Sequence, residues 1–189
     1  MNRAVIFDVN ETMLDLGALY PLFAQWFGDP AARREWFAQT LHFAMTLAAM
    51  LDLPAHHDVV PALRMLRDAG LVTAALSNNP LPVVQEQLHH AGLSPLFAEI
   101  MSVDEAGALK PAPEVYDFAV RRLDLPPGSV WMVAAHGWDI AGATHAGLRG
   151  AFVARPGQSP DPFAPPEIIA EDLLTLADAI LAAERLPHT

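Results

Sequence analysis

The chain has 189 residues, 52% of them hydrophobic and none of them cysteine, which suits one domain with a sizeable core and excludes disulfides and thiolate metal sites. Its 22 Asp and Glu against 11 Lys and Arg give a formal net charge of -11, which argues against nucleic-acid and anionic-membrane partners because both require a basic surface. No apolar run approaches the ~20 residues that span a bilayer, and no signal-type segment precedes the first apolar run, so we expect a cytoplasmic protein.

Short apolar runs alternate with amphipathic stretches along most of the chain. The runs are too short for helices and largely lack polar alternation, which is typical of strands buried on both faces. They span residues 4–7, 71–76, 99–102, 130–134 and 150–154. The predicted helices span residues 58–70, 80–92, 112–125, 137–150 and 171–186, and the Pro-rich segment 154–167 is predicted to be a surface loop. This alternation predicts an α/β domain with a doubly wound, Rossmann-like parallel sheet.

Residues 17–56 interrupt the alternation, because they are predicted to form helices without an intervening strand. Asp29 as N-cap and Pro30 at the first helical position are a favourable helix start. We expect a short helical cap insert after the first strand, lying over the carboxyl ends of the strands where open α/β sheets bind ligands. The alternative is a helical hairpin that serves only stability or dimerisation. The core domain would then comprise residues 1–16 and 57–189.

Polar residues follow four of the predicted strands, and the carboxyl ends of parallel strands meet at one edge of a sheet. These residues are Asp8, Ser77 with Asn78, Lys110, and His136 with Asp139. A carboxylate becomes a competent nucleophile when it is oriented and shielded from water, and a nearby lysine would lower its pKa by opposite charge. Ser77 and the backbone N–H groups after Asp8, beginning with Val9, could bind an anionic group of a substrate. Asp139 could orient Lys110 or help to activate a water molecule.

Four segments resemble the motifs of the haloacid dehalogenase-like hydrolase superfamily, and more narrowly of its type II, L-2-haloacid dehalogenase branch. They are "FDVNETMLD", "LSNN", "LKPAPEVY" and "VAAHGWDIAGA". The resemblance implies a Rossmann-like core in which Asp8 is the nucleophile and Ser77 binds the oxyanion of the substrate. It implies further that Lys110 steadies the charges and that Asp139 completes the acidic end of the site. Tyr116 matches a tyrosine that this branch keeps after the lysine.

Asn10 separates two chemistries within this superfamily. Its phosphatases carry an Asp at this position, which protonates the leaving oxygen, and they bind Mg²⁺ with an acid where this chain has Ala135. An amide cannot transfer a proton at useful pH, whereas a halide leaving group needs neither a proton nor a metal. We therefore expect an enzyme that displaces halide from a small 2-haloacid through an ester on Asp8, with no cofactor and no metal ligands. The predicted substrate-binding residues are Val9, Asn10, Ser77, Asn78, Tyr116 and His136.

The chain also departs from the type II branch. The branch usually has an aromatic residue where Asn10 stands, and an arginine that cradles the halide where this chain has Phe37, with Arg33 and Arg34 one turn away. His136 stands in place of a polar residue of the fourth motif. It could hold a water molecule or the substrate carboxylate, or it could only pair with Asp8 or Asp139.

These departures leave two other functions open. One is a Mg²⁺-dependent phosphatase of small metabolites, and the other is a catalytically silent protein that binds an anion or dimerises. The insert seems shorter than the usual cap of the branch, and an apolar stripe at 43–51 would then be partly uncovered. We therefore expect a homodimer that forms through the insert.

Overall fold

The computed structural model describes residues 3–19, 21, 24–25 and 50–185. Most of the helical insert predicted for residues 17–56, including Asp29, Pro30 and nearly all of the apolar stripe, lies outside the described residues. The division into core and insert therefore stays a prediction. Within the described part of the chain, no helix is both long and apolar enough to cross a membrane.

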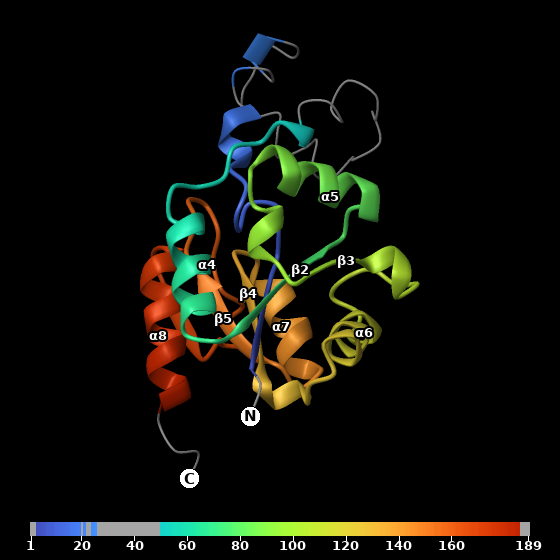
Figure 1. Cartoon of the computed structure of the whole chain (residues 1–189), viewed down its shortest axis with the longest axis vertical. Coiled ribbons are helices and arrows are strands. Elements are labelled where there is room, and N and C mark those ends of the chain that lie inside the picture. Colours follow the sequence, from blue (N-terminus) through green and yellow to red (C-terminus); the bar gives the residue numbers. More distant parts are fainter. Residues whose placement is uncertain (1–2, 20, 22–23, 26–49, 186–189) are drawn as a thin grey trace.

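Six strands form one sheet in which every neighbouring pair is parallel (Figure 1). Their order across the sheet is β3-β2-β1-β4-β5-β6. The strands are β1 (Ala4–Phe7), β2 (Val72–Ser77), β3 (Glu99–Ser102), β4 (Val130–Ala134), β5 (Arg149–Val153) and β6 (Ile168–Ala170). Phe7, the last residue of β1, pairs with Ala75 of β2 and Val133 of β4, which places the carboxyl end of β1 in the middle of the sheet.

The sixth strand, β6, was not predicted from the sequence, whose pattern indicated a loop over residues 154–167 followed by a helix from residue 171. It has only three residues, and of these Ala170 alone is buried. Its three residues are apolar, but a run this short does not distinguish a strand from a loop. The other five strands were predicted to within one residue at either end.

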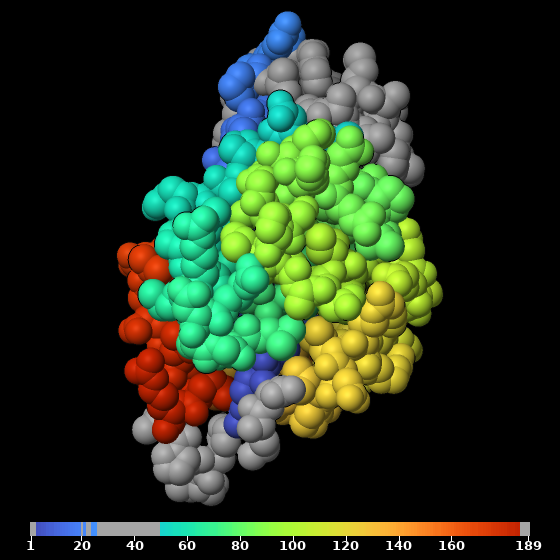
Figure 2. Space-filling view, viewed as in Figure 1, coloured from blue at the N-terminus to red at the C-terminus, as the bar shows by residue number. Residues whose placement is uncertain are grey.

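Helices cover both faces of the sheet, which confirms the doubly wound α/β fold. One layer contains α4 (Val59–Asp68), α5 (Leu81–His90) and α8 (Leu173–Arg185), and the other contains α6 (Pro113–Leu123) and α7 (Gly137–His145). Alternate residues of β1 face the two layers, Val5 and Phe7 toward the first and Ala4 and Ile6 toward the second. Figure 2 shows the surfaces of α4 and α8 adjoining on one side of the molecule.

Short 3-10 helices occur in the connections between these elements. They are η1 (Leu16–Leu19), η3 (Ser94–Leu96), η4 (Val103–Glu105) and η5 (Pro127–Ser129). The loop that follows β1 turns sharply at Glu11, where φ is 64° in the left-handed region. Further along this loop, Leu14 forms an isolated antiparallel bridge with Ala55. This loop is therefore fastened to the segment that returns from the insert.

A buried ion pair also holds the loop that follows β1. Arg155, just beyond β5, is 6% exposed and donates two 2.9 Å hydrogen bonds to the carboxylate of Asp58, at the start of α4. It also donates to the carbonyl oxygen of Thr12 at 3.0 and 3.3 Å. The Asp58 carboxylate accepts a further bond from the N–H of Leu173, at the start of α8. Burial would raise the pKa of Asp58, but these donors lower it below its usual value.

We expect the substitution Arg155→Met to lower the free energy of unfolding by about 3–5 kcal/mol, because it leaves the Asp58 charge buried without its cation. Arg122→Met is the matched control. The Arg122 side chain is 48% exposed and pairs with Glu99 at the surface, so its loss should cost at most about 1 kcal/mol. Urea unfolding measures both values, and equal losses would contradict the anchoring role of Arg155.

Candidate active site

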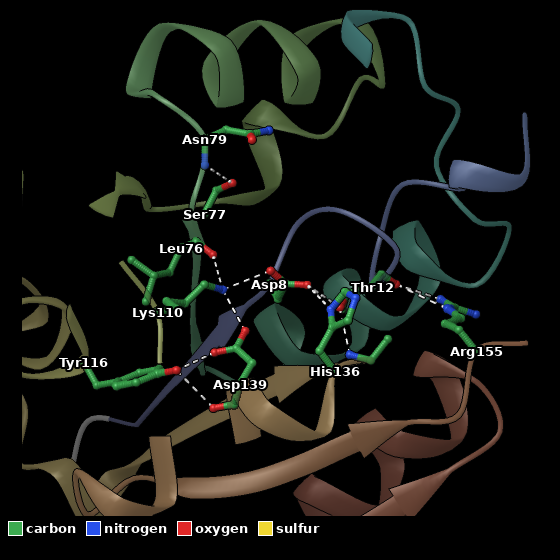
Figure 3. Close-up of polar contacts among 11 residues, drawn as sticks. Asp8, Thr12, Leu76, Ser77, Asn79, Lys110, Tyr116, His136, Asp139 and Arg155 are labelled. Atoms are coloured by element: carbon green, nitrogen blue, oxygen red, sulfur yellow. Dashed lines mark hydrogen bonds and ion pairs between the residues drawn. The ribbon is translucent and has the colours of Figure 1, made fainter. Parts of the chain in front are cut away.

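β1 is followed directly by a carboxylate that is almost completely buried. Asp8 is 7% exposed, and its own N–H donates to the carbonyl oxygen of Val133 on the adjacent β4. Its two carboxylate oxygens have different partners, since Oδ1 accepts from Lys110 Nζ at 2.9 Å and Oδ2 accepts from Thr12 Oγ1 at 2.7 Å (Figure 3). Burial would raise the pKa of Asp8, but the charge of Lys110 and the contacts with His136 hold it well below the ordinary value. Asp8 is therefore a buried but ionised carboxylate.

Lys110 lies at the centre of the polar contacts. Its Nζ donates to Asp8 Oδ1 at 2.9 Å, to Asp139 Oδ2 at 2.7 Å and to the carbonyl oxygen of Leu76 at 3.1 Å. These three acceptors match the three hydrogens of an ammonium group. Burial opposes the charged form, but Asp139 and Asp8 raise the pKa of Lys110 above its usual value. Lys110 thus stays a cation between two carboxylates.

Asp139, in the first turn of α7, is completely buried. Its Oδ2 accepts from Lys110, and its Oδ1 accepts from the Tyr116 hydroxyl at 2.7 Å. Burial and the negative charge of Asp8 raise the pKa of Asp139, against the effect of Lys110. Burial and the charge of Asp139 likewise raise the pKa of Tyr116, so its hydroxyl remains a donor. Both oxygens of Asp139 are occupied by hydrogen-bond donors.

A glycine allows this close packing. A Cβ atom at Gly142 of α7 would lie 2.6 Å from Cβ of Pro111 and 2.8 Å from the Tyr116 hydroxyl. Only glycine lets the helix approach the segment after Lys110 so closely. The backbone approach at Gly142 therefore helps to bring Tyr116 within reach of Asp139.

His136 directly precedes α7 and lies beside the nucleophile candidate. Its Nδ1 is 3.6 Å from Asp8 Oδ2, and its ring contacts that of Trp138 with centroids 5.4 Å apart. Burial would lower the pKa of His136, but Asp8 and Asp139 raise it above the usual value. Among the partners that the sequence suggested for His136, Asp8 is the one that lies within ion-pair distance of its ring.

Thr12 was not singled out by the sequence analysis. Its hydroxyl donates to Asp8 Oδ2 at 2.7 Å and accepts from the N–H of Ala135 at 2.9 Å, so it connects the loops that follow β1 and β4. The only signal in the sequence was a hydroxyl residue four positions after Asp8 in the same loop. No periodicity places a loop side chain, so its partner 123 residues away could not be found from the pattern.

Ser77 and Asn78 shape the loop after β2. The Ser77 hydroxyl, 1% exposed, accepts from the N–H of Asn79, and Asn78 Oδ1 accepts from the N–H of Lys110 at 3.0 Å. Asn78 therefore helps to position the backbone of Lys110. The predicted contact of Ser77 with a substrate oxyanion stays a prediction.

Asn10 belongs to a side-chain network that the sequence did not reveal. Gln87 of α5 is completely buried and donates to Asn10 Oδ1 at 3.3 Å and to the carbonyl oxygen of Met50 at 3.0 Å. Its own oxygen accepts from Asn79 Nδ2 at 3.0 Å. The network fastens the loops after β1 and β2 to the end of the returning insert segment.

The predicted substrate contact of Val9 and the expected halide contact in the insert both stay predictions. Val9 is buried and its carbonyl oxygen accepts from the N–H groups of Met13 and Leu14, while its predicted role as an N–H donor to a substrate stays a prediction. The expected halide contact depends on residues that lie outside the described part of the chain, namely Phe37, Arg33 and Arg34.

Among the residues that the structure does describe, no group of three or more His, Cys, Asp or Glu side chains is arranged to hold a metal ion.

We expect Thr12→Val to lower the free energy of unfolding by about 1–3 kcal/mol, because the buried N–H of Ala135 loses its acceptor and Asp8 loses a donor. Thr12→Ser keeps the hydroxyl and should retain most of this stability. Chemical denaturation of both variants makes the comparison. A larger loss in the serine variant would mean that the methyl group, and not the hydroxyl, is the important part of Thr12.

Comparison with known proteins places these residues in a family context. Residues 2–147 match the family described as haloacid dehalogenase-like hydrolase. The chain is 40% identical over 97 residues to (S)-2-haloacid dehalogenase 1 of Pseudomonas sp. (strain CBS-3), which covers 51% of this chain and 43% of that protein. It is 31% identical over 134 residues to (S)-2-haloacid dehalogenase H-109 of Pseudomonas putida, covering 70% of this chain and 60% of that protein. The chain thus spans about half the length of the curated relatives it matches.

Solved structures with the same fold include other dehalogenases. An L-2-haloacid dehalogenase with 25% identity superposes with a TM-score of 0.80 over 95% of this chain and 99% of that chain. The L-2-haloacid dehalogenase of Xanthobacter autotrophicus with chloropropionic acid covalently bound has a TM-score of 0.81 at 20% identity, over 96% of this chain and 99% of that chain. At 20% identity the likeness shows the fold alone.

Proposed function

Because the chain belongs to the haloacid dehalogenase-like hydrolase family, we propose that it releases halide from a small 2-haloacid through an ester on Asp8. The observation that carries this proposal is the buried, ionised carboxylate of Asp8 at the carboxyl end of β1, held by Lys110 and Thr12. The substrate class is taken from the relatives named as (S)-2-haloacid dehalogenases.

In the first step, an oxygen of Asp8 attacks the carbon that bears the halogen. A carbon–oxygen bond forms, the carbon–halogen bond breaks, and halide leaves with the bonding electrons, so that the configuration at this carbon is inverted. The attack requires an ionised carboxylate with little hydration, and Asp8 meets both conditions because Lys110 keeps it charged and it is buried. We assign the substrate carboxylate to Ser77 and to the N–H groups that follow Asp8.

In the second step, water attacks the carboxyl carbon of Asp8. The bond from this carbon to the ester oxygen breaks, the 2-hydroxy acid departs, and Asp8 keeps one oxygen from the water. Negative charge develops on the carboxyl oxygens in the tetrahedral intermediate. Lys110 Nζ already lies 2.9 Å from Asp8 Oδ1, where it would stabilise this charge, and Tyr116 and Asp139 would hold the ammonium group in place.

The surroundings of Asn10 agree with a leaving group that needs no proton. Its side-chain oxygen accepts a hydrogen bond from Gln87, and an amide offers no acid to a departing alcohol oxygen. A halide leaves as a stable anion, so dehalogenation does not need an acid here. The cytoplasmic location and the homodimer through the insert stay predictions.

We expect wild-type protein to release halide from 2-chloropropionate or 2-bromopropionate, and turnover in H₂¹⁸O to place ¹⁸O in the carboxylate of Asp8. Asp8→Asn should release no halide above the uncatalysed rate, because an amide cannot form the ester. Asp104→Asn, at an exposed position outside the site, is the matched control and should behave as wild type. Halide assays and mass spectrometry of the peptide with Asp8 make the test. Halide release without label in Asp8 would contradict the ester mechanism.

The ionisation of Asp8 gives a separate pH prediction. A carboxyl group acts as a nucleophile above its pKa, and an ordinary pKa near 3.8 would remove about two thirds of the rate at pH ~3.5. Because the pKa of Asp8 lies well below that value, the first equivalent of halide should appear at nearly equal rates at pH ~3.5 and pH ~5. A brief pH jump with saturating substrate, followed by rapid quench, measures these rates. A threefold fall at the lower pH would show that Asp8 titrates normally.

A further inference from the structure

One ring nitrogen beside Asp8 is buried and carries no hydrogen bond within the described part of the chain. This atom is Nδ1 of His136, which lies 3.6 Å from Asp8 Oδ2, beyond hydrogen-bond distance. Buried polar atoms are nearly always bonded to protein or to water, so an exception calls for an explanation. In the free protein the only partner of Nδ1 in the described structure is this long ion pair with Asp8, so Nδ1 is suited to bind a water molecule that approaches the carboxyl carbon of Asp8.

We infer that His136 is a catalytic residue whose Nδ1 accepts a proton from the water that hydrolyses the Asp8 ester. The inference rests on the proposed function, because only an ester on Asp8 needs this water. It goes beyond that function in naming the base.

The other groups around Asp8 are unsuited to this role. Lys110 is a cation with its three hydrogens already donated, so it has no lone pair for a proton. The Thr12 hydroxyl already accepts from Ala135 and is a very weak base. Asp139 shares no hydrogen bond with Asp8 in the described structure, and its two oxygens are occupied by Lys110 and Tyr116. His136 is the one neighbour of Asp8 in the described structure with an unoccupied lone pair when its ring is neutral.

The charges around His136 change in the direction that this role requires. Three charged groups act on the ring: Asp8 from the loop after β1, Asp139 from α7 and Lys110 from the loop after β3. In the free protein the two carboxylates favour the imidazolium against burial and Lys110. Ester formation makes Asp8 neutral and removes the nearest negative charge, so the pKa of His136 falls. The imidazole then loses its proton to solvent and becomes a base only after halide has left.

The proton balance closes over one cycle. The water oxygen bonds to the carboxyl carbon of Asp8 while one of its protons moves to His136 Nδ1. The bond from the carboxyl carbon to the ester oxygen then breaks, and the departing alkoxide takes the proton of the newly added hydroxyl. Asp8 returns as a carboxylate and His136 as an imidazolium, which is the starting state. Hydrolysis of an ester to a carboxylate and an alcohol releases one proton overall. In this cycle it is the proton that the imidazolium of His136 gives to solvent after halide has left.

The test compares His136→Gln with wild-type protein in rapid-quench reactions with 2-bromopropionate. Halide and the mass of the intact protein are followed together. We expect His136→Gln to release one equivalent of halide at close to the wild-type rate and then to accumulate the ester. Steady-state turnover should fall by about 100-fold or more, as for loss of a general base. His145→Gln, the same substitution at an exposed position on α7, is the matched control and should turn over normally.

Three results would overturn the inference. Turnover of His136→Gln within about threefold of wild type, without accumulated ester, would show that another group takes the proton. Loss of the first halide equivalent in a folded variant would place His136 in the displacement step instead. Absence of halide and of ester in wild-type protein would remove the proposed function and this inference with it. The first two results leave the proposed function intact, so the two failures are distinguishable.

A second measurement needs no variant. Ester formed on wild-type protein at low pH is jumped to a series of pH values between ~5 and ~9, and its decay is followed by mass. The decay rate should rise with pH through a single ionisation, because the neutral imidazole is the active form, while the displacement rate should not follow it. A decay rate that is flat across this range would overturn the inference even if His136→Gln fails to fold.

Discussion

The site depends on one buried cation shared by two carboxylates. Lys110 is 5% exposed, and its ammonium group bridges Asp8, which follows β1, and Asp139, which lies in the first turn of α7. Breaking such an arrangement by removing one partner leaves an uncompensated charge in the interior, so each member requires the others. The two carboxylates differ: burial and the charge of Asp8 raise the pKa of Asp139, whereas Lys110 and His136 lower the pKa of Asp8 against the effect of its own burial. The interaction thus favours the ionised form of Asp8, the nucleophile that we propose, while Asp139 holds the ammonium group in place.

Bonds from the rest of the fold hold this charged cluster in position. Arg155, which is held by Asp58, donates to the carbonyl oxygen of Thr12, and the Thr12 hydroxyl donates to Asp8 Oδ2. The loop after β1 is therefore held at several points before any substrate binds. Preorganised donors of this kind stabilise developing charge without further rearrangement during the reaction. The buried pair at Arg155 makes no contact with the cluster itself and acts through the loop that it supports.

Two departures from the family pattern acquire a physical setting in the structure. Asn10 is bonded to Gln87, which also binds the carbonyl of Met50, so the residue two positions after Asp8 is tied to the segment that begins at residue 50. His136 replaces the usual polar residue with a titratable ring beside Asp8. The first departure removes an acid that halide displacement does not need. The second departure adds the base that we infer for ester hydrolysis. Together they fit a reaction in which halide leaves without a proton, and in which a proton is transferred only when water hydrolyses the ester.

Much of this protein was determined by the sequence alone. Five of the six strands appear as apolar runs because strands buried on both faces need them, and Asp8, Lys110, His136 and Asp139 meet because the carboxyl ends of parallel strands share one edge. The family followed from four motifs. Only the tertiary structure decided that Thr12 bridges Asp8 and Ala135, that Gln87 binds Asn10 and that β6 completes the sheet. The two hydrogen bonds join residues that are distant in the chain, and they depend on how the loops pack against one another. Such contacts produce no periodic pattern in the sequence, and the edge strand is too short to produce one.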